Sequence, residues 1–145
     1  MAFFGLFGGK KKGYSSPWLQ LTVVHATARD SLEPEHKFAI RGKVLAAKPL
    51  QFEIGESHTY TVIFPGDEMG LQAGNSFANS LREYAREKSL TSFGVGVAQG
   101  ECLAQMSGAG RLVGKPVGAA VAQAKQLAAE EADANAAAPN AGQLD

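Results

Sequence analysis

Residues 18–28, WLQLTVVHATA, decide the fold class of this chain. Their side chains alternate, and they include the β-branched residues Val23 and Val24, which is typical of a β-strand. The alternation places Leu21 and Val23 on one face and Val24 on the other. We therefore predict that the folded part of the chain begins with a strand at Trp18.

Further segments with strand character lie on both sides of one predicted helix. They alternate in the same way or end at proline and glycine turns, and they cover residues 37–46, 50–54, 58–64, 93–98 and 101–106. In 93–98 glycines occupy one face, which indicates a close approach of another backbone or a sharp bend of the strand.

Two helices are predicted. Asn75 is a favourable N-cap, and Phe77 and Leu81 recur at helical spacing, so a helix is expected over about 75–89. Pro116 suits the first turn of a second, alanine-rich helix that extends to about residue 132.

The order of these elements predicts an α+β domain in which antiparallel strands predominate. A small curved sheet, an OB-like barrel and a β-sandwich are all compatible with one internal helix, at about 75–89, and an alanine-rich C-terminal helix, at about 116–132. We expect three regions in the chain. They are a flexible N-terminal docking peptide and linker at 1–17, a single β-rich domain at 18–132 and a disordered tail at 133–145.

Composition and charge limit the function classes. The chain has 145 residues, of which 45% are hydrophobic and 19% are charged, so it fits one globular domain. Its formal net charge is zero, which excludes an overall field that attracts nucleic acid or acidic lipid. Cys102 is the single cysteine, which excludes an intrachain disulfide and favours a reducing compartment. The first lysines follow an apolar stretch instead of preceding it, so we expect no secretory signal and a cytoplasmic location, with attachment to a membrane surface or an assembly as an option.

No group of residues in the sequence forms a convincing catalytic or metal site. His25, His36 and His58 are scattered, and none has a histidine or cysteine at ligand spacing. Cys102 falls in a β-type segment without a nucleophile elbow, and 108–116 lacks the spacing and the hydroxyl of a phosphate loop. We therefore predict no enzymatic activity, no metal, no cofactor and no small-molecule substrate.

The N-terminal stretch MAFFGLFGGKKK, residues 1–12, predicts a docking peptide. Aromatic side chains next to cations are typical of segments that bind a protein groove or an anionic membrane surface. The residues expected to bind are Phe3, Phe4, Leu6, Phe7, Lys10, Lys11 and Lys12. The leading prediction is a small non-catalytic binding or assembly module, for which a protein partner or self-association is favoured over a membrane. Packing of the peptide against its own domain is a further alternative.

A second prediction comes from the cations of the expected strand at 37–46. Lys37, Arg41 and Lys43, followed by Lys48, would lie on one strand face without an intervening acid, a pattern that can follow a phosphodiester backbone. An OB-like single-stranded nucleic-acid-binding protein is therefore the alternative function. The competing interpretation is an exposed edge strand that its lysines protect from pairing with other strands.

Overall fold

The computed structural model describes residues 18–56 and 59–137 of the chain. The predicted docking peptide, with all of its phenylalanine and lysine side chains, lies outside the described residues. The same holds for His58 and for residues 138–145 of the predicted tail. The expectations for these segments stay predictions.

The described residues form five strands and three helices. In chain order they are β1 (Trp18–Ala28), α1 (Pro34–Ala47), β2 (Gln51–Ile54), β3 (Thr59–Pro65), α2 (Glu68–Glu87), β4 (Phe93–Met106), β5 (Leu112–Val117) and α3 (Ala119–Ala137). The strands make one sheet in the order β2-β3-β1-β4-β5, and every neighbouring pair is antiparallel. The predicted α+β class with a small curved antiparallel sheet is confirmed.

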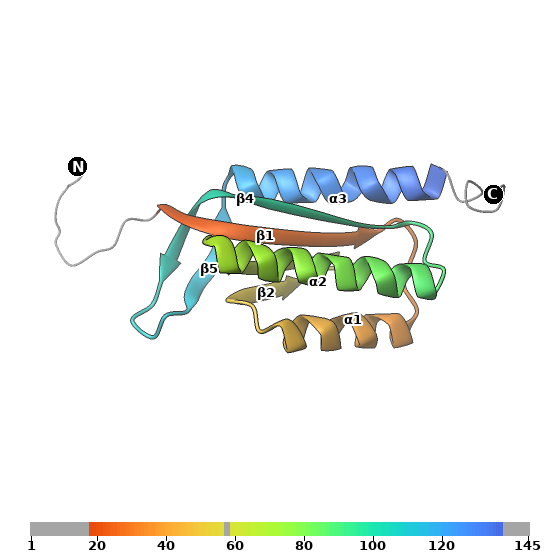
Figure 1. Cartoon of the computed structure of the whole chain (residues 1–145), viewed down its shortest axis with the longest axis horizontal. Coiled ribbons are helices and arrows are strands. Elements are labelled where there is room, and N and C mark those ends of the chain that lie inside the picture. Colours follow the sequence, from red (N-terminus) through yellow and green to blue (C-terminus); the bar gives the residue numbers. More distant parts are fainter. Residues whose placement is uncertain (1–17, 57–58, 138–145) are drawn as a thin grey trace.

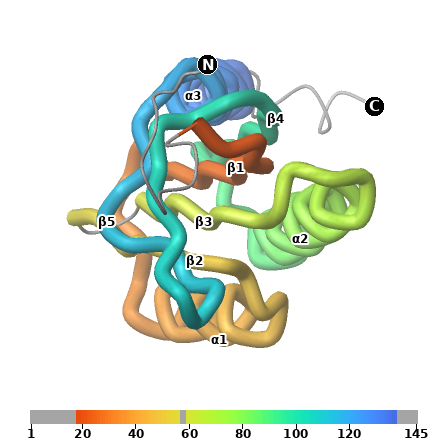
Figure 2. The backbone as a smooth tube through the Cα atoms, turned by 90° about the vertical axis from the view of Figure 1, so that its left-hand side faces the viewer, coloured from red at the N-terminus to blue at the C-terminus, as the bar shows by residue number. Residues whose placement is uncertain are grey.

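The sheet curves until its two edge strands come together (Figure 2). Gln51 on β2 donates a hydrogen bond from Nε2 to the Gly114 carbonyl on β5, at 2.7 Å. Lys115 Nζ on β5 lies 2.6 Å from a Glu53 carboxylate oxygen on β2. The sheet is therefore barrel-like and nearly closed where β5 meets β2.

Helices cover both faces of the sheet (Figure 1). Helices α1 and α2 lie on one face, and α3 lies on the other. The segments β1-α1-β2 and β3-α2-β4 are the two crossovers of a split βαβ arrangement, and this places both crossover helices on the same face. The core between these helices and the sheet contains large buried side chains, among them Tyr60, Phe64, Phe77, Leu81 and Phe93.

The predicted strand over 37–46 is wrong, because these residues belong to α1. Pro34 lies in the first turn of the helix, and Ile40 and Val44, four residues apart, are the side chains that it buries. Phe38 lies on the opposite side, with 79% of its surface exposed. Apolar residues on two sides of one helix produced an alternation that is typical of a strand.

Helix α2 begins well before Asn75, directly after its N-cap Asp67. The Asp67 carboxylate accepts a hydrogen bond from the Gly70 N–H at 2.7 Å. The start of the helix was not predicted, because Gly70 and Gly74 are residues typical of loops. A Cβ added to Gly70 would overlap the Pro65 carbonyl, so this glycine allows the helix to start tightly against the end of β3.

Helix α3 begins at Ala119, so Pro116 lies in β5 and not in the first turn of the helix predicted at 116–132, and α3 extends to Ala137, into the predicted tail. It packs on β4 through small residues. A Cβ on Gly94 or Gly96 would overlap the backbone of α3 near Ala128. The buried residues of α3 recur at every fourth position and are all alanines, namely Ala120, Ala124, Ala128 and Ala132. The close backbone approach predicted from the glycines of 93–98 is confirmed.

The described helices also bear on membrane topology. Within residues 18–56 and 59–137, none of them combines the length and the apolar character that crossing a lipid bilayer requires.

Candidate functional site

The first half of β4 has a neighbouring strand on one side only. It pairs with β1 from Phe93 to Leu103, whereas β5 joins it only from Leu103 onward. The main-chain groups that point away from β1 before Leu103 need other partners, because an unpaired buried polar group costs free energy. Side chains of α2 and α3 supply these partners near Phe93.

Three of these side chains form what we call the edge cluster: Arg82 from α2, and Glu131 and Asn135 from α3. Arg82 donates from Nη2 to the Val95 carbonyl at 2.9 Å. The Glu131 carboxylate accepts from the Val95 N–H at 3.1 Å. Asn135 donates from Nδ2 to the Phe93 carbonyl at 2.8 Å. The edge cluster thus takes the place of a neighbouring strand.

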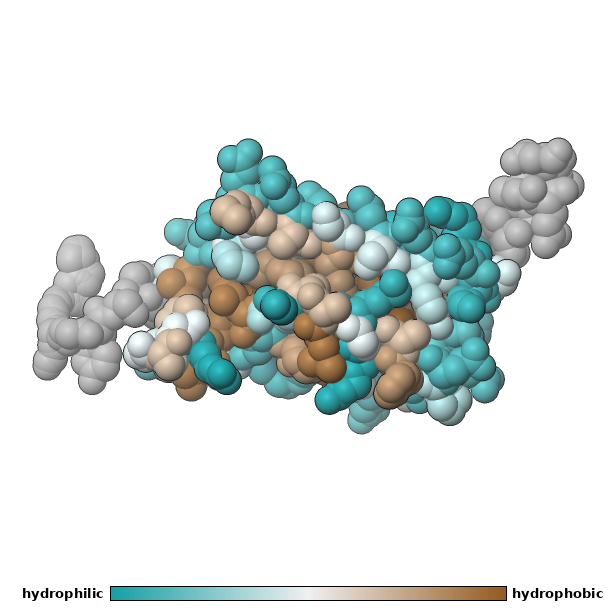
Figure 3. Space-filling model, turned by 60° about the horizontal axis from the view of Figure 1, so that its bottom comes forward, coloured by the Kyte–Doolittle hydropathy of each residue, from teal (hydrophilic) through white to brown (hydrophobic). Residues whose placement is uncertain are grey.

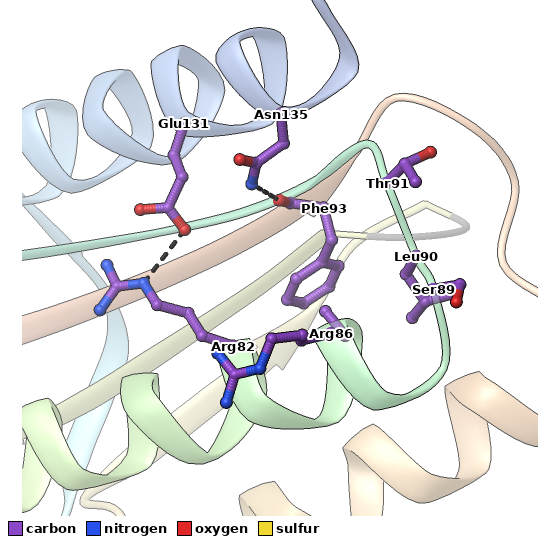
Figure 4. Close-up of a pocket in the computed structure, with 9 residues that line it drawn as sticks. Arg82, Arg86, Ser89, Leu90, Thr91, Phe93, Glu131 and Asn135 are labelled. Atoms are coloured by element: carbon purple, nitrogen blue, oxygen red, sulfur yellow. Dashed lines mark hydrogen bonds and ion pairs between the residues drawn. The ribbon is translucent and has the colours of Figure 1, made fainter. Parts of the chain in front are cut away.

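An ion pair within the edge cluster links the two faces of the sheet. Arg82 Nε lies 3.0 Å from the Glu131 Oε2 atom, and the dashed line in Figure 4 marks this contact between α2 and α3. Arg82 also donates from Nη1 to the Asn79 side-chain oxygen at 3.2 Å. All three nitrogen atoms of the Arg82 guanidinium are therefore engaged, and its orientation is fixed.

A cavity of about 670 Å³, which we call the edge pocket, lies beside the edge cluster (Figure 4). Its apolar lining comes from Ala85, Leu90 and Phe93, and the Phe93 ring projects toward α2. Its polar lining comes from the edge cluster and from Arg86, Ser89 and Thr91. The volume and the mixed lining are typical of small-molecule sites, which generally measure about 300–1,000 Å³.

Arg86 gives the edge pocket a net positive charge. The charges of Arg82 and Glu131 neutralise each other at 3.0 Å. Arg86 is exposed and forms no ion pair with any other residue of the described ranges. A guanidinium binds phosphate and carboxylate oxygens in pairs, so the edge pocket favours an anionic ligand.

His25 is a buried titratable side chain on the α3 face of the sheet. It is 8% exposed, and its Nδ1 lies 2.9 Å from the Thr61 hydroxyl on β3. Burial, and to a smaller extent the charge of Lys125, lowers the pKa of His25 to about 4. The imidazole is therefore neutral near pH 7.

The cations of the predicted nucleic-acid-binding face lie on a helix instead of a strand. Lys37, Arg41 and Lys43 belong to α1, and Lys48 is its C-cap residue. Lys43 Nζ is 5.7 Å from the centre of the Tyr84 ring on α2. The spacing of Lys37, Arg41 and Lys48 places these three on another side of the helix. The structure therefore does not bring the four cations together on one face.

Cys102 and His36 have structural partners. Cys102 is fully buried, and burial raises the pKa of its thiol. His36 lies in α1, is half-buried, and its Nδ1 is 2.8 Å from the Tyr84 hydroxyl.

The edge-pocket residues carry only weak signals in the sequence. Arg82 and Arg86 are four residues apart on the predicted helix at 75–89, and Glu131 and Asn135 repeat this spacing later in the chain. Each pair therefore shares one side of a helix. The Arg82–Glu131 contact joins residues 49 positions apart, and no local pattern marks it.

No protein-family model matches the sequence, and no curated protein sequence matches it either. Solved structures do share the fold. The guanylyl cyclase Cya2 aligns with 82% of this chain and 73% of its own, with a TM-score of 0.59 and 14% sequence identity. Two structures of a bacterial light-regulated adenylyl cyclase align with 77% and 78% of this chain and 40% of theirs, at 12% identity and TM-scores of 0.48 and 0.49. The comparison with the guanylyl cyclase establishes a cyclase-like fold for the described residues.

This likeness corrects two expectations from the sequence. A non-catalytic module that docks through its N-terminal peptide is contradicted, because the described part of the chain has the fold of an enzyme domain. An OB-like single-stranded nucleic-acid-binding protein is contradicted by the same finding. The prediction that the chain is not an enzyme is wrong on the same ground. The prediction of no enzymatic activity had relied on the absence of catalytic motifs, whereas the likeness lies in the arrangement of the elements.

Proposed function

We propose that this chain binds a purine nucleoside triphosphate in the edge pocket and acts in cyclic-nucleotide chemistry. The observation that carries the proposal is the fold shared with a guanylyl cyclase over 82% of the chain. One fold can host several functions, so this support is an argument by analogy of fold. The edge pocket adds a second support that is independent of the comparison, because its size and charge suit an anionic ligand.

The chemistry of the edge pocket suggests how each part of a nucleotide would bind. The base would lie against Leu90, the partly exposed apolar residue of the lining, because Ala85 and Phe93 are buried in the core. The exposed Arg86 guanidinium would bind the phosphate oxygens, because it has no competing carboxylate among the described residues. Thr91, at the rim, offers a hydroxyl group to the ribose. These roles make Arg86 the residue on which affinity depends most.

Reactions of nucleoside triphosphates commonly employ Mg²⁺ held by carboxylates and by the phosphates themselves. In the part of the chain that the structure describes, no group of three or more His, Cys, Asp or Glu side chains is placed to hold a metal ion. The described side chains therefore do not form a metal site by themselves. The proposed roles concern the binding and orientation of the nucleotide.

We place this function in the cytoplasm. The chain has a single cysteine, which is buried and unpaired, as is typical of proteins in a reducing compartment. Nucleoside triphosphates are substrates in that same compartment, so the location and the proposed ligand agree.

Binding of fluorescent GTP and ATP analogues to the full chain tests the proposal. We expect saturable binding that Arg86→Ala weakens at least fivefold, because the variant removes the free cation of the edge pocket. Arg111→Ala is the matched control, because Arg111 is also exposed but lies in the turn between β4 and β5. Chromatography of the incubated nucleotides then detects any cyclic product.

Two results would contradict the proposal. One is the lack of saturable binding of either nucleotide at millimolar concentration. The other is an equal loss of affinity in Arg86→Ala and Arg111→Ala, which would mean that the nucleotide responds to overall charge and not to the edge pocket.

A further inference from the structure

Helix α1 exposes large apolar side chains on the side opposite to its core side. Ile40 and Val44 face the core and are fully buried. On the other side, Phe38 is 79% exposed and Leu45 is 50% exposed. Gly42 lies between them in sequence, and no atom is within 4 Å of the position where its Cβ would be. The helix therefore has apolar side chains on two sides, and the described residues cover one of them.

The orientation of α1 is fixed by contacts with α2. The Tyr84 hydroxyl on α2 lies within hydrogen-bond distance of His36 Nδ1, at 2.8 Å. Lys43 Nζ lies over the Tyr84 ring, 5.7 Å from the ring centre. Together with the buried Ile40 and Val44, these contacts hold the helix against rotation. Phe38 and Leu45 are therefore presented to solvent by a rigid element.

Cations lie beside these exposed apolar side chains. Lys37, Arg41 and Lys48 share one side of the helix by their spacing, and none of them takes part in the ion pairs of the described residues. The acids of this segment, Glu33 and Glu35, are confined to its start. The outer side of α1 thus combines apolar groups with unpaired positive charge.

From these observations we infer that the outer side of α1 binds the surface of an anionic lipid bilayer. Figure 3, with the α1 side of the molecule turned forward, shows apolar surface interspersed with hydrophilic groups on this side. Phe38 and Leu45 would enter the interface between headgroups and acyl chains, while Lys37, Arg41 and Lys48 would contact lipid phosphates. Charge complementarity selects this occupant, because a neutral apolar partner would leave three cations without a counter-charge.

Cosedimentation of the full chain with vesicles tests the inference. We compare vesicles of phosphatidylcholine with vesicles of phosphatidylcholine and phosphatidylglycerol. We expect binding to the anionic vesicles that falls steeply with salt. Phe38→Ser combined with Leu45→Ser should weaken this binding at least fivefold. Lys37→Gln combined with Arg41→Gln should weaken it about twenty-fivefold, because each cation near such a surface contributes about fivefold.

Matched controls lie on β5 and in a turn. Val113 and Val117 are 55% and 63% exposed, so Val113→Ser with Val117→Ser removes a comparable apolar surface elsewhere. Lys88→Gln with Arg111→Gln removes the same charge away from α1. We expect both control pairs to bind anionic vesicles like the unaltered chain. Circular dichroism of every variant checks that the fold is retained.

Three results would overturn the inference. The first is the same sedimentation with neutral and anionic vesicles. The second is unchanged vesicle binding in the variant that combines Phe38→Ser with Leu45→Ser. This includes the case in which vesicle binding is lost only when Phe3, Phe4 and Phe7 are replaced by serine. The third is binding of a single-stranded oligonucleotide that competes fully with vesicles and does not depend on Phe38, because this would indicate a purely electrostatic surface.

Discussion

Glu131 joins three parts of the molecule through one carboxylate oxygen. Its Oε2 atom accepts hydrogen bonds from the Val95 N–H on β4 and from Arg82 Nε on α2, while its own backbone belongs to α3. The carboxylate is 31% exposed, so solvent screens the ion pair only in part. Glu131 should therefore contribute more to the stability of the sheet edge than a surface carboxylate without such contacts.

Glu131→Gln should lower the free energy of unfolding by about 1–3 kcal/mol, because a charge-assisted hydrogen bond is lost and the Arg82 charge loses its partner. Urea denaturation of both proteins measures this difference. Glu130→Gln is the control, since Glu130 is exposed and accepts a hydrogen bond from Gln126 on its own helix. Equal midpoints for Glu131→Gln and the unaltered chain would show that the edge cluster does not stabilise the fold.

His25 should make the stability depend on pH. Its pKa is about 4 in the folded chain and 6.5 in the unfolded chain, so the unfolded state binds the proton first as the pH falls. Stability should therefore decrease between about pH 6.5 and pH 4, by at most about 1.4 kcal/mol per pH unit, and stay constant with respect to this group at higher pH.

Unfolding of the His25→Gln and His36→Gln variants between pH 5 and 7 separates this effect from other titrations. His25→Gln should remove the slope in that range, whereas His36→Gln should keep it. The same slope in all three proteins would mean that the pKa of His25 is the same in the folded and the unfolded chain.

At the scale of whole elements, two glycines in different surroundings should respond in opposite directions to the same substitution. Gly96→Ala puts a Cβ into the backbone of α3, so it should destabilise the chain by about 1–3 kcal/mol. Gly42→Ala adds a Cβ in open space within α1, so it should stabilise the chain by about 0.5–1 kcal/mol. Thermal unfolding of both variants checks the pair, and a gain in stability for Gly96→Ala would contradict the observed α3–β4 packing.

The elements differ in how well local pattern determines them. The strand at 18–28 was predicted correctly, because its β-branched residues Val23 and Val24 face opposite sides of the sheet and both are buried. Helix α1 was predicted as a strand, since Phe38 is apolar but exposed, and periodicity is informative only when apolar residues face the core. Gly70 and Gly74 hid the first turns of α2, because glycine serves there for close packing instead of for a turn.

The candidate site could be predicted even less than the elements. Its cavity forms where the end of α2, the start of β4 and the end of α3 meet, and these elements are brought together only by the crossover topology. Asn135 was assigned to a tail beyond the last predicted helix, so its place beside Phe93 had no local signal. Residue types alone could indicate an anionic ligand only after the fold had joined them.

At the scale of the whole molecule, the arrangement separates two surfaces. The edge pocket lies at the margin of the sheet between α2 and α3. The exposed side of α1 belongs to the other crossover helix, away from α3. If both proposals hold, a nucleotide and a bilayer would bind without competing for the same residues.

The most direct test of the central claim is a titration of GTP into the ¹⁵N-labelled full chain, followed by amide NMR shifts. Binding in the edge pocket predicts saturable shifts that gather at Arg86, Thr91, Phe93 and Asn135, with little change along β5. Shifts that gather elsewhere in the described residues, or no saturable shifts at millimolar GTP, would contradict the account.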